Sequence, residues 1–83
     1  MKLEEIHEEI AGVIYRMICR EIEMGFPPNR SWESIELVLE DEFKEGGELH
    51  RFKFMEKDGY DYAKKYWEKN WTKIAKEQGY FDD

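Results

Sequence analysis

Hydrophobic residues recur at helical spacing along the first quarter of the chain. Between residues 3 and 24, one side of a helix would collect these apolar side chains: Leu3, Ile6, Ile10, Val13, Ile14 and Met17. The i, i+3, i+4, i+7 spacing is typical of a helix that buries one stripe in a core. The opposite side of the first half is acidic, which also suits the positive end of the helix dipole, and carries Glu4, Glu5, Glu8 and Glu9. The pattern predicts one long amphipathic helix on which the other segments pack.

The second half of this predicted helix carries another apolar strip, which projects away from the first. Tyr15, Ile18, Cys19 and Ile22 form this strip. A helix that is apolar nearly all round makes contacts on two sides. In a chain this short, the second side is covered either by the other helices or by another copy of the protein. We therefore name Tyr15, Cys19 and Ile22 as candidate self-association residues.

A turn and a second helix are predicted next. Gly25 suits the left-handed position after a helix end, and the prolines at 27 and 28 prevent the helix from resuming. Ser31 is a good N-cap residue, so we expect the second helix to start there and to reach Lys44 or Glu45. One face of that helix would carry Trp32, Ile35, Leu39 and Phe43.

A β-hairpin over residues 35–55 is the alternative for this region. Ile35, Leu37 and Leu39 alternate with acidic residues, and a Gly-Gly pair follows at the position of a hairpin turn. A strand would, however, place Asp41 on the apolar face. Helix is therefore the preferred interpretation.

The last third of the chain predicts a short helix at 48–57, a break at Asp58-Gly59 and a final helix at 60–78. The apolar stripe of the final helix is Tyr60, Ala63, Trp67, Trp71 and Ile74. Gly79 ends this helix, and the two aromatic residues that follow can fold back on its last turn. The predicted fold is all-α, a small bundle of three main helices plus one short element, with an α+β hairpin fold as the alternative.

Length and composition narrow the class of protein. Eighty-three residues form one domain over positions 1–83, and 41% hydrophobic with 16% aromatic residues is too apolar for a disordered chain. No apolar run approaches the ~20 residues of a membrane-spanning helix, and no signal-peptide pattern opens the chain. A single cysteine cannot form an internal disulfide. We expect a cytoplasmic protein without a membrane partner.

The net charge of −7 is unevenly distributed along the chain. Residues 1–49 hold thirteen acidic and five basic side chains, whereas residues 50–83 hold seven and eight. A strongly acidic chain has little general affinity for nucleic acid backbones or anionic membranes. Nucleic acid is therefore an unlikely partner.

Candidate chemistry is sparse. Glu4-x-x-His7 has the spacing of a bundle metal motif, but no second motif accompanies it, because Gly47 stands three residues before His50. Neither a paired-cysteine motif nor a phosphate-binding loop is present, and a cysteine within an apolar helical strip is usually a packed side chain. We expect no catalytic residue, metal or cofactor, and hence a protein that is not an enzyme.

Charged surfaces offer better candidates, as contacts for another protein. The final helix would present Lys65, Lys69 and Lys73 on its outer side, with Tyr62 and Tyr66 along one flank. Basic residues beside aromatic rings are typical of single-stranded nucleic acid binders, but they also form ordinary solvated faces or dock on acidic helices of a second copy.

The acidic second helix is the other candidate surface, through Glu36, Glu40 and Asp41. These carboxylates would suit a basic partner protein. The predicted function is a small acidic protein-binding or regulatory module that acts through self-association, as a possible homodimer, and through docking to a partner. The alternative is an inhibitor, similar in size and charge to those of bacterial viruses, that imitates nucleic acid charge. A single-stranded nucleic acid binder is the third hypothesis.

Overall fold

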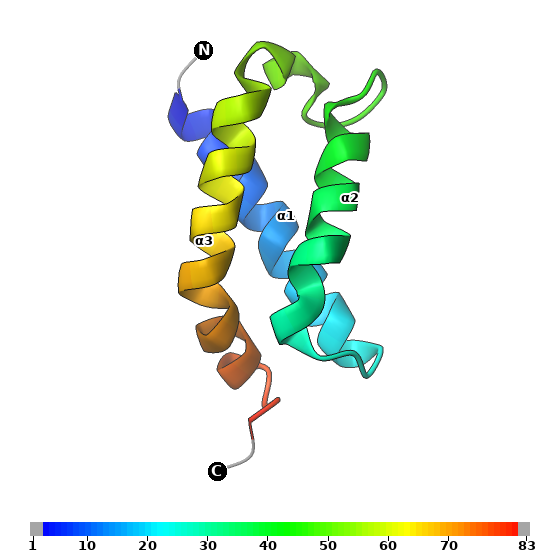
Figure 1. The fold of residues 1–83 in the computed structure, drawn as a ribbon, viewed down its shortest axis with the longest axis vertical. Coiled ribbons are helices and arrows are strands. Elements are labelled where there is room, and N and C mark those ends of the chain that lie inside the picture. The colour runs from blue at the N-terminus through cyan, green and yellow to red at the C-terminus, as the bar shows by residue number, and fades with distance from the viewer. Residues whose placement is uncertain (1–2, 82–83) are drawn as a thin grey trace.

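The computed structural model describes residues 3–81, with Leu3 described by its backbone only. Three α-helices and two short 3₁₀ helices make up this part of the chain (Figure 1). In chain order they are α1 (Leu3–Glu23), η1 (Pro28–Arg30), α2 (Ser31–Phe43), η2 (His50–Met55) and α3 (Glu56–Glu77). The predicted all-α bundle of three main helices is therefore confirmed. Within residues 3–81 no strand is present, so the alternative hairpin at 35–55 is wrong.

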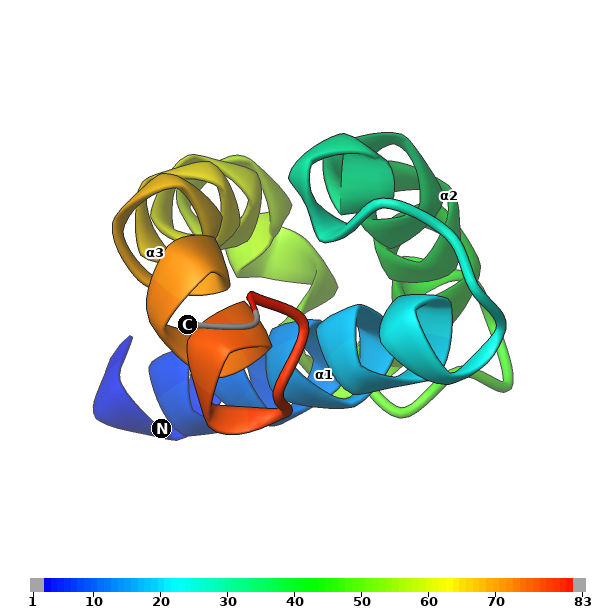
Figure 2. The same cartoon turned by 90° about the horizontal axis from the view of Figure 1, so that it is seen from below.

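The helices form two layers. α1 is one layer, and α2 and α3 lie side by side over it (Figure 2). One apolar core fills the space between the layers, and its largest fully buried side chains are Ile6, Ile10, Ile14, Ile18, Ile35, Leu39, Phe43, Leu49 and Phe52. Full burial of such a side chain contributes about 1.5–3 kcal/mol, so this core is the main source of stability.

α1 buries the predicted stripe. Ile6, Ile10, Val13 and Ile14 are buried and Met17 is half-buried, while the side chain of Leu3 lies outside the described residues. The helix ends in a Schellman motif, as its glycine predicts: Gly25 has a φ of 84°, and the Phe26 N–H donates to the Glu21 carbonyl at 2.8 Å.

The predicted N-cap role of Ser31 is wrong. Arg30 occupies the cap position, because the 3₁₀ turn η1 runs directly into α2. Ser31 is instead the first residue of α2, and its side chain is fully buried. Its hydroxyl donates to the Pro28 carbonyl at 2.6 Å. The rest of the predicted α2 face is present, with Ile35, Leu39 and Phe43 buried and Trp32 half-buried.

The predicted break at Asp58-Gly59 is also wrong. The short segment before it is the 3₁₀ helix η2, and α3 begins at Glu56 and continues through Gly59. Gly59 is buried at the contact with α1. A Cβ atom there would lie 3.0 Å from Phe43 Cζ and 3.1 Å from Ile10 Cδ1. This glycine permits close helix packing instead of ending a helix.

α3 carries its predicted stripe against the core. Ala63 and Ile74 are buried, and the larger aromatic members of the stripe are half-buried. The helix ends in a second Schellman motif, in which the Tyr80 N–H donates to the Ala75 carbonyl at 3.0 Å and Gly79 has a φ of 78°. The final turn therefore folds back on α3, as its sequence predicts.

Candidate binding surfaces

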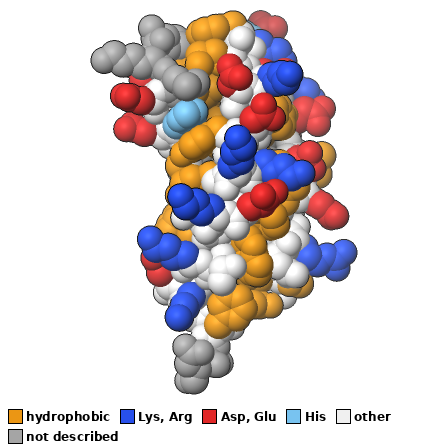
Figure 3. All heavy atoms as spheres, turned by 60° about the vertical axis from the view of Figure 1, so that its left-hand side comes forward, with side chains coloured by type: hydrophobic (Ala, Val, Ile, Leu, Met, Phe, Trp, Pro, Cys, Tyr) orange, Lys and Arg blue, Asp and Glu red, His pale blue; other side chains and the backbone are white. Residues whose placement is uncertain are grey.

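The lysine row of α3 is exposed from the middle of the helix to its end. Lys65, Lys69, Lys73 and Lys76 all face solvent, and none of the four lies within ion-pair distance of another described side chain. Figure 3 shows basic side chains at successive heights on this face, with hydrophobic side chains visible between them. The row has the geometry of a solvated helix face.

The two tyrosines beside this row are engaged within the protein. The imidazole of His7 stacks on the Tyr62 ring, with centroids 3.8 Å apart and planes 7° apart, and Tyr66 lies 5.9 Å from Tyr62. Both tyrosines are half-buried. Burial is the main cause that raises the pKa of Tyr62, and the interaction with Tyr66 raises it further. The structure thus places Tyr62 and Tyr66 at the α1–α3 contact, where one ring face of Tyr62 is already covered.

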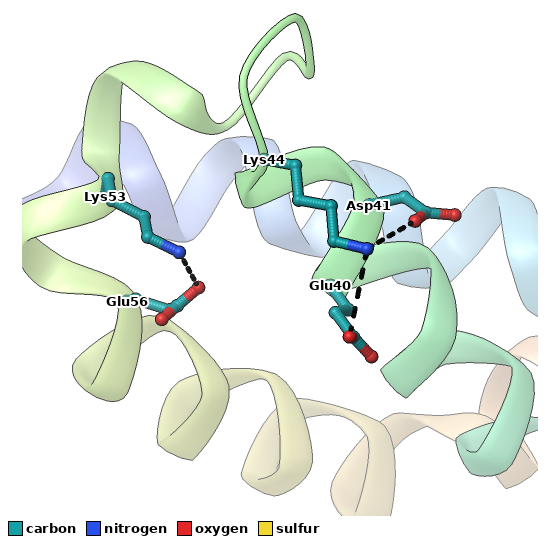
Figure 4. A network of polar contacts seen from close by, with 5 residues as sticks. All are labelled: Glu40, Asp41, Lys44, Lys53 and Glu56. Carbon is teal, nitrogen blue, oxygen red and sulfur yellow. Dashed lines mark hydrogen bonds and ion pairs between the residues drawn. The ribbon is translucent and has the colours of Figure 1, made fainter.

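The acidic face of α2 is fully accessible. Glu36, Glu40 and Asp41 are exposed, and Glu33 extends the face by one turn. Lys44 lies 3.9 Å from Glu40 and 3.6 Å from Asp41, as Figure 4 shows beside the separate Lys53–Glu56 pair. Exposed ion pairs of this kind contribute about 0–1 kcal/mol to stability. Glu40 and Asp41 can therefore exchange their contact with Lys44 for a contact with a partner.

Leu37 is the residue on this face that the charge pattern did not reveal. It is 65% exposed and lies one helical turn from both Glu33 and Asp41. An isolated exposed leucine is common, but this one stands at the centre of an acidic surface. In a helix, Leu37 falls outside the buried stripe of Ile35 and Leu39, which indicates that it is exposed. The hairpin alternative instead placed it on one apolar strand face with Ile35 and Leu39.

The second strip of α1 is divided between solvent and the protein interior. Cys19 and Ile22 are half-buried and pack against the core, whereas Tyr15 is 40% exposed and accepts a hydrogen bond from Gln78 Nε2 at 3.3 Å. Burial raises the pKa of the Cys19 thiol, and the nearby thiol in turn raises the pKa of Tyr15. The same chain therefore covers part of this strip.

A shallow concave patch lies on the outer side of α1. Gly12 is exposed near its centre, and the patch is lined by Glu8, Glu9, Ala11, Gly12, Tyr15, Arg16, Glu48 and Tyr66. A Cβ atom at Gly12 would meet nothing within 4 Å. On one flank Arg16 lies 3.9 Å from Glu48, and Glu9 lies 3.4 Å from Arg51. Both ion pairs are long and exposed and lie at one edge of the patch, so they do not cover it.

A second depression lies where α1 ends and α2 begins. It is lined by Glu21, Phe26, Pro27, Arg30, Glu33 and Ser34. Glu21 is half-buried there. No polar group is fully buried in this wall without a partner, among the residues that the structure describes.

Metal-binding and membrane-spanning features are not found in the described residues. Between positions 3 and 81, no three His, Cys, Asp or Glu side chains gather closely enough to hold a metal ion. In the same range, no helix has both the length and the apolar character required to cross a membrane. Comparison of the chain with protein-family models, curated proteins and solved structures gives no match in any of the three.

Proposed function

We propose that the protein is a small acidic binding module, without catalytic activity, that docks the α2 face on a basic surface of a partner protein. The observation that carries this proposal is Leu37, which is 65% exposed and has Glu33, Glu40 and Asp41 one helical turn away. An apolar anchor inside a polar rim is the usual anatomy of a protein interface. The lone, half-buried Cys19 supports a reducing, cytoplasmic location.

The two parts of the surface would contribute differently to binding. Transfer of the Leu37 side chain from water into an apolar pocket of the partner would contribute about 1.5–3 kcal/mol to the binding free energy. Most of this contribution is available because Leu37 is solvated in the free protein. The carboxylates would accelerate association with a basic partner and select against acidic ones. Affinity would thus depend on Leu37 and specificity on the acids.

Charge imitation of a nucleic acid is the second candidate, supported by the same run of carboxylates on α2. Imitation requires negative charge at phosphate-like spacing, whereas an apolar side chain has no counterpart in a phosphate backbone. The two candidates therefore differ in their dependence on Leu37. A nucleic-acid-binding protein with a basic channel would tolerate Leu37→Ala, and an anchored interface would not.

Two defined peptides separate these candidates. One is an amphipathic helix of lysines and leucines, and the other is a peptide of equal charge with alanine in place of each leucine. We expect Leu37→Ala to weaken binding of the leucine peptide about tenfold and to leave binding of the alanine peptide unchanged, since one apolar contact is worth about 1–2 kcal/mol. Fluorescence anisotropy measures both affinities.

The matched control for this experiment is Phe54→Ala. Phe54 is 72% exposed but lies in η2, next to the basic Lys53, and is not part of the acidic helix α2. This variant should bind both peptides as the unmodified protein does. Binding of both peptides that is unchanged by Leu37→Ala would remove the anchored interface and leave charge imitation. Equal losses for Leu37→Ala and Phe54→Ala, or a Leu37→Ala loss that is the same for both peptides, would also remove the anchored interface.

A further inference from the structure

Glycine is an unfavourable residue at position 12, and no contact within the chain requires it there. It is exposed at the middle of α1, and a Cβ atom added there would meet no atom within 4 Å. An exposed glycine inside a helix destabilises it by about 0.5–1 kcal/mol relative to alanine. Glycine is useful at such a position when another backbone approaches closely. Gly12 alone does not indicate which molecule would supply that backbone, but the charged residues around it do.

The charges beside Gly12 are segregated along one flank of α1. Glu5 and Glu9 precede it by seven and three residues, and Arg16 and Arg20 follow it by four and eight. At 3.6 residues per turn, all four project within about 80° of Gly12 on the same side. From Glu5 to Arg20 the flank is thus acidic before Gly12 and basic after it, at nearly equal distances, and Glu23 at the end of α1 lies beyond this stretch on the same side.

We propose that a second copy of this chain docks antiparallel on the outer side of α1, with the two helices crossing at Gly12. A two-fold axis there would place Glu9 opposite Arg16 of the second copy and Glu5 opposite Arg20 of the second copy. Each contact occurs twice, because an isologous interface uses the same surface on both copies. A parallel arrangement would instead bring acids against acids.

The intrachain ion pairs extend this pattern. In each copy Arg51 lies 3.4 Å from Glu9, and Glu48 lies 3.9 Å from Arg16. The antiparallel contact joins them into a row of alternating charges. Networks of this kind are more stabilising than isolated surface pairs. Glu5 and Arg20 make no ion pair with any other described residue, so they are the ones left for the second copy.

The architecture leaves this side of the protein accessible. Figure 2 shows α2 and the first part of α3 above α1, while the last turns of α3 come down to the level of α1, where Gln78 donates a hydrogen bond to Tyr15. No described helix lies below α1 in this view. Tyr15, 40% exposed, and Cys19 lie on the other flank of Gly12 and would add apolar contact. The α2 face stays free in such a dimer, so this inference is independent of the proposed function and would give it two docking faces.

Sedimentation equilibrium over a concentration series from about 1 to about 500 µM tests the dimer, because a contact made mainly by one helix of each copy is expected to be weak. We expect micromolar self-association. Glu5→Arg alone and Arg20→Glu alone should each weaken the dimer about fivefold or more, since each places like charges together twice. The double variant, Glu5→Arg with Arg20→Glu, should restore the original affinity, because the swapped charges are again complementary.

Gly12→Leu is the steric test and Thr72→Leu its control. Gly12→Leu has room in the folded chain but would separate the two backbones, so we expect a monomer. Thr72 is exposed on α3, and Thr72→Leu should leave the dimer unchanged. A monomer throughout the concentration series overturns the proposal. So does a dimer that survives Gly12→Leu, or a double variant no stronger than the single variants.

Discussion

The indole nitrogen of Trp67 donates a hydrogen bond to the Ser31 hydroxyl at 2.8 Å, and that hydroxyl donates to the Pro28 carbonyl at 2.6 Å. Ser31 is fully buried. The chain of two hydrogen bonds joins the η1 turn, the first residue of α2 and the middle of α3. It therefore fixes the position of α2, which carries the proposed docking face.

Ser31→Ala should destabilise the fold by about 2 kcal/mol. The substitution leaves the N–H of the half-buried Trp67 without its partner, and a buried donor left unpaired costs about 1–3 kcal/mol. Urea unfolding measures the change in the free energy of unfolding. Ser34→Ala, three residues along α2 and half-buried, should change it by less than about 0.5 kcal/mol. Equal effects of the two variants would contradict the role assigned to Ser31.

Gly12→Ala and Gly59→Ala should shift stability in opposite directions. At Gly12 alanine gains helix propensity without a steric contact, so we expect stabilisation by about 0.5–1 kcal/mol. At Gly59 the same gain is outweighed, because the Cβ atom would press on the buried side chains of Phe43 and Ile10, and overpacking costs about 1–3 kcal/mol. Thermal unfolding at low protein concentration compares the two. A stabilising Gly59→Ala would show that the α1–α3 contact is looser than described.

Stability should fall as the pH rises above about 9. Burial raises the pKa of Cys19, Tyr60 and Tyr62 above their ordinary values of 9.0, 10.0 and 10.0. The unfolded chain therefore loses these protons first, and ionisation favours unfolding. Their contribution is complete below pH 9.0 and is lost as the pH passes through the raised pKa values. The urea midpoint followed from pH 8 to 11 should decline, and less steeply in Tyr60→Phe and Tyr62→Phe.

Single-stranded oligonucleotides should leave the tryptophan fluorescence unchanged. One ring face of Tyr62 is covered by His7, and the net charge of −7 repels a polyphosphate. A titration with oligothymidine at about 0.15 M salt tests this expectation. Saturable quenching that is lost on replacing Lys65 and Lys69 by glutamine would instead assign the α3 face to nucleic acid.

The sequence predicted the helices well, because their stripes of Ile, Leu and Trp repeat at a clear helical period. It failed where a residue type has two uses. Ser31 is of a type common at helix caps, and it is also a small polar side chain that can accept a hydrogen bond from a half-buried indole. Only the position of Trp67 decides between these two roles. Gly59 is a common helix breaker and also the one residue that lets α3 approach Phe43 so closely.

The candidate surfaces also include features that the sequence predicts and features that it does not. The exposure of Glu36, Glu40 and Asp41 follows from the phase of the buried stripe of α2, and the exposure of the α3 lysines follows from the phase of the stripe of α3. The engagement of Tyr62 could not be foreseen, because it depends on His7, which is fifty-five residues away in the chain. Leu37 could have been found by asking which apolar side chain falls outside the buried stripe.

The central claim, that α2 is the docking face, is tested most directly by NMR. Amide shifts of the isotopically labelled protein are followed while the lysine–leucine helical peptide is added. We predict that the largest changes centre on Leu37 and extend to Glu33, Glu40 and Asp41, and that Leu37→Ala reduces them at the same peptide concentration. Changes spread over the acidic start of α1, or centred on the α3 lysine row, would contradict the claim.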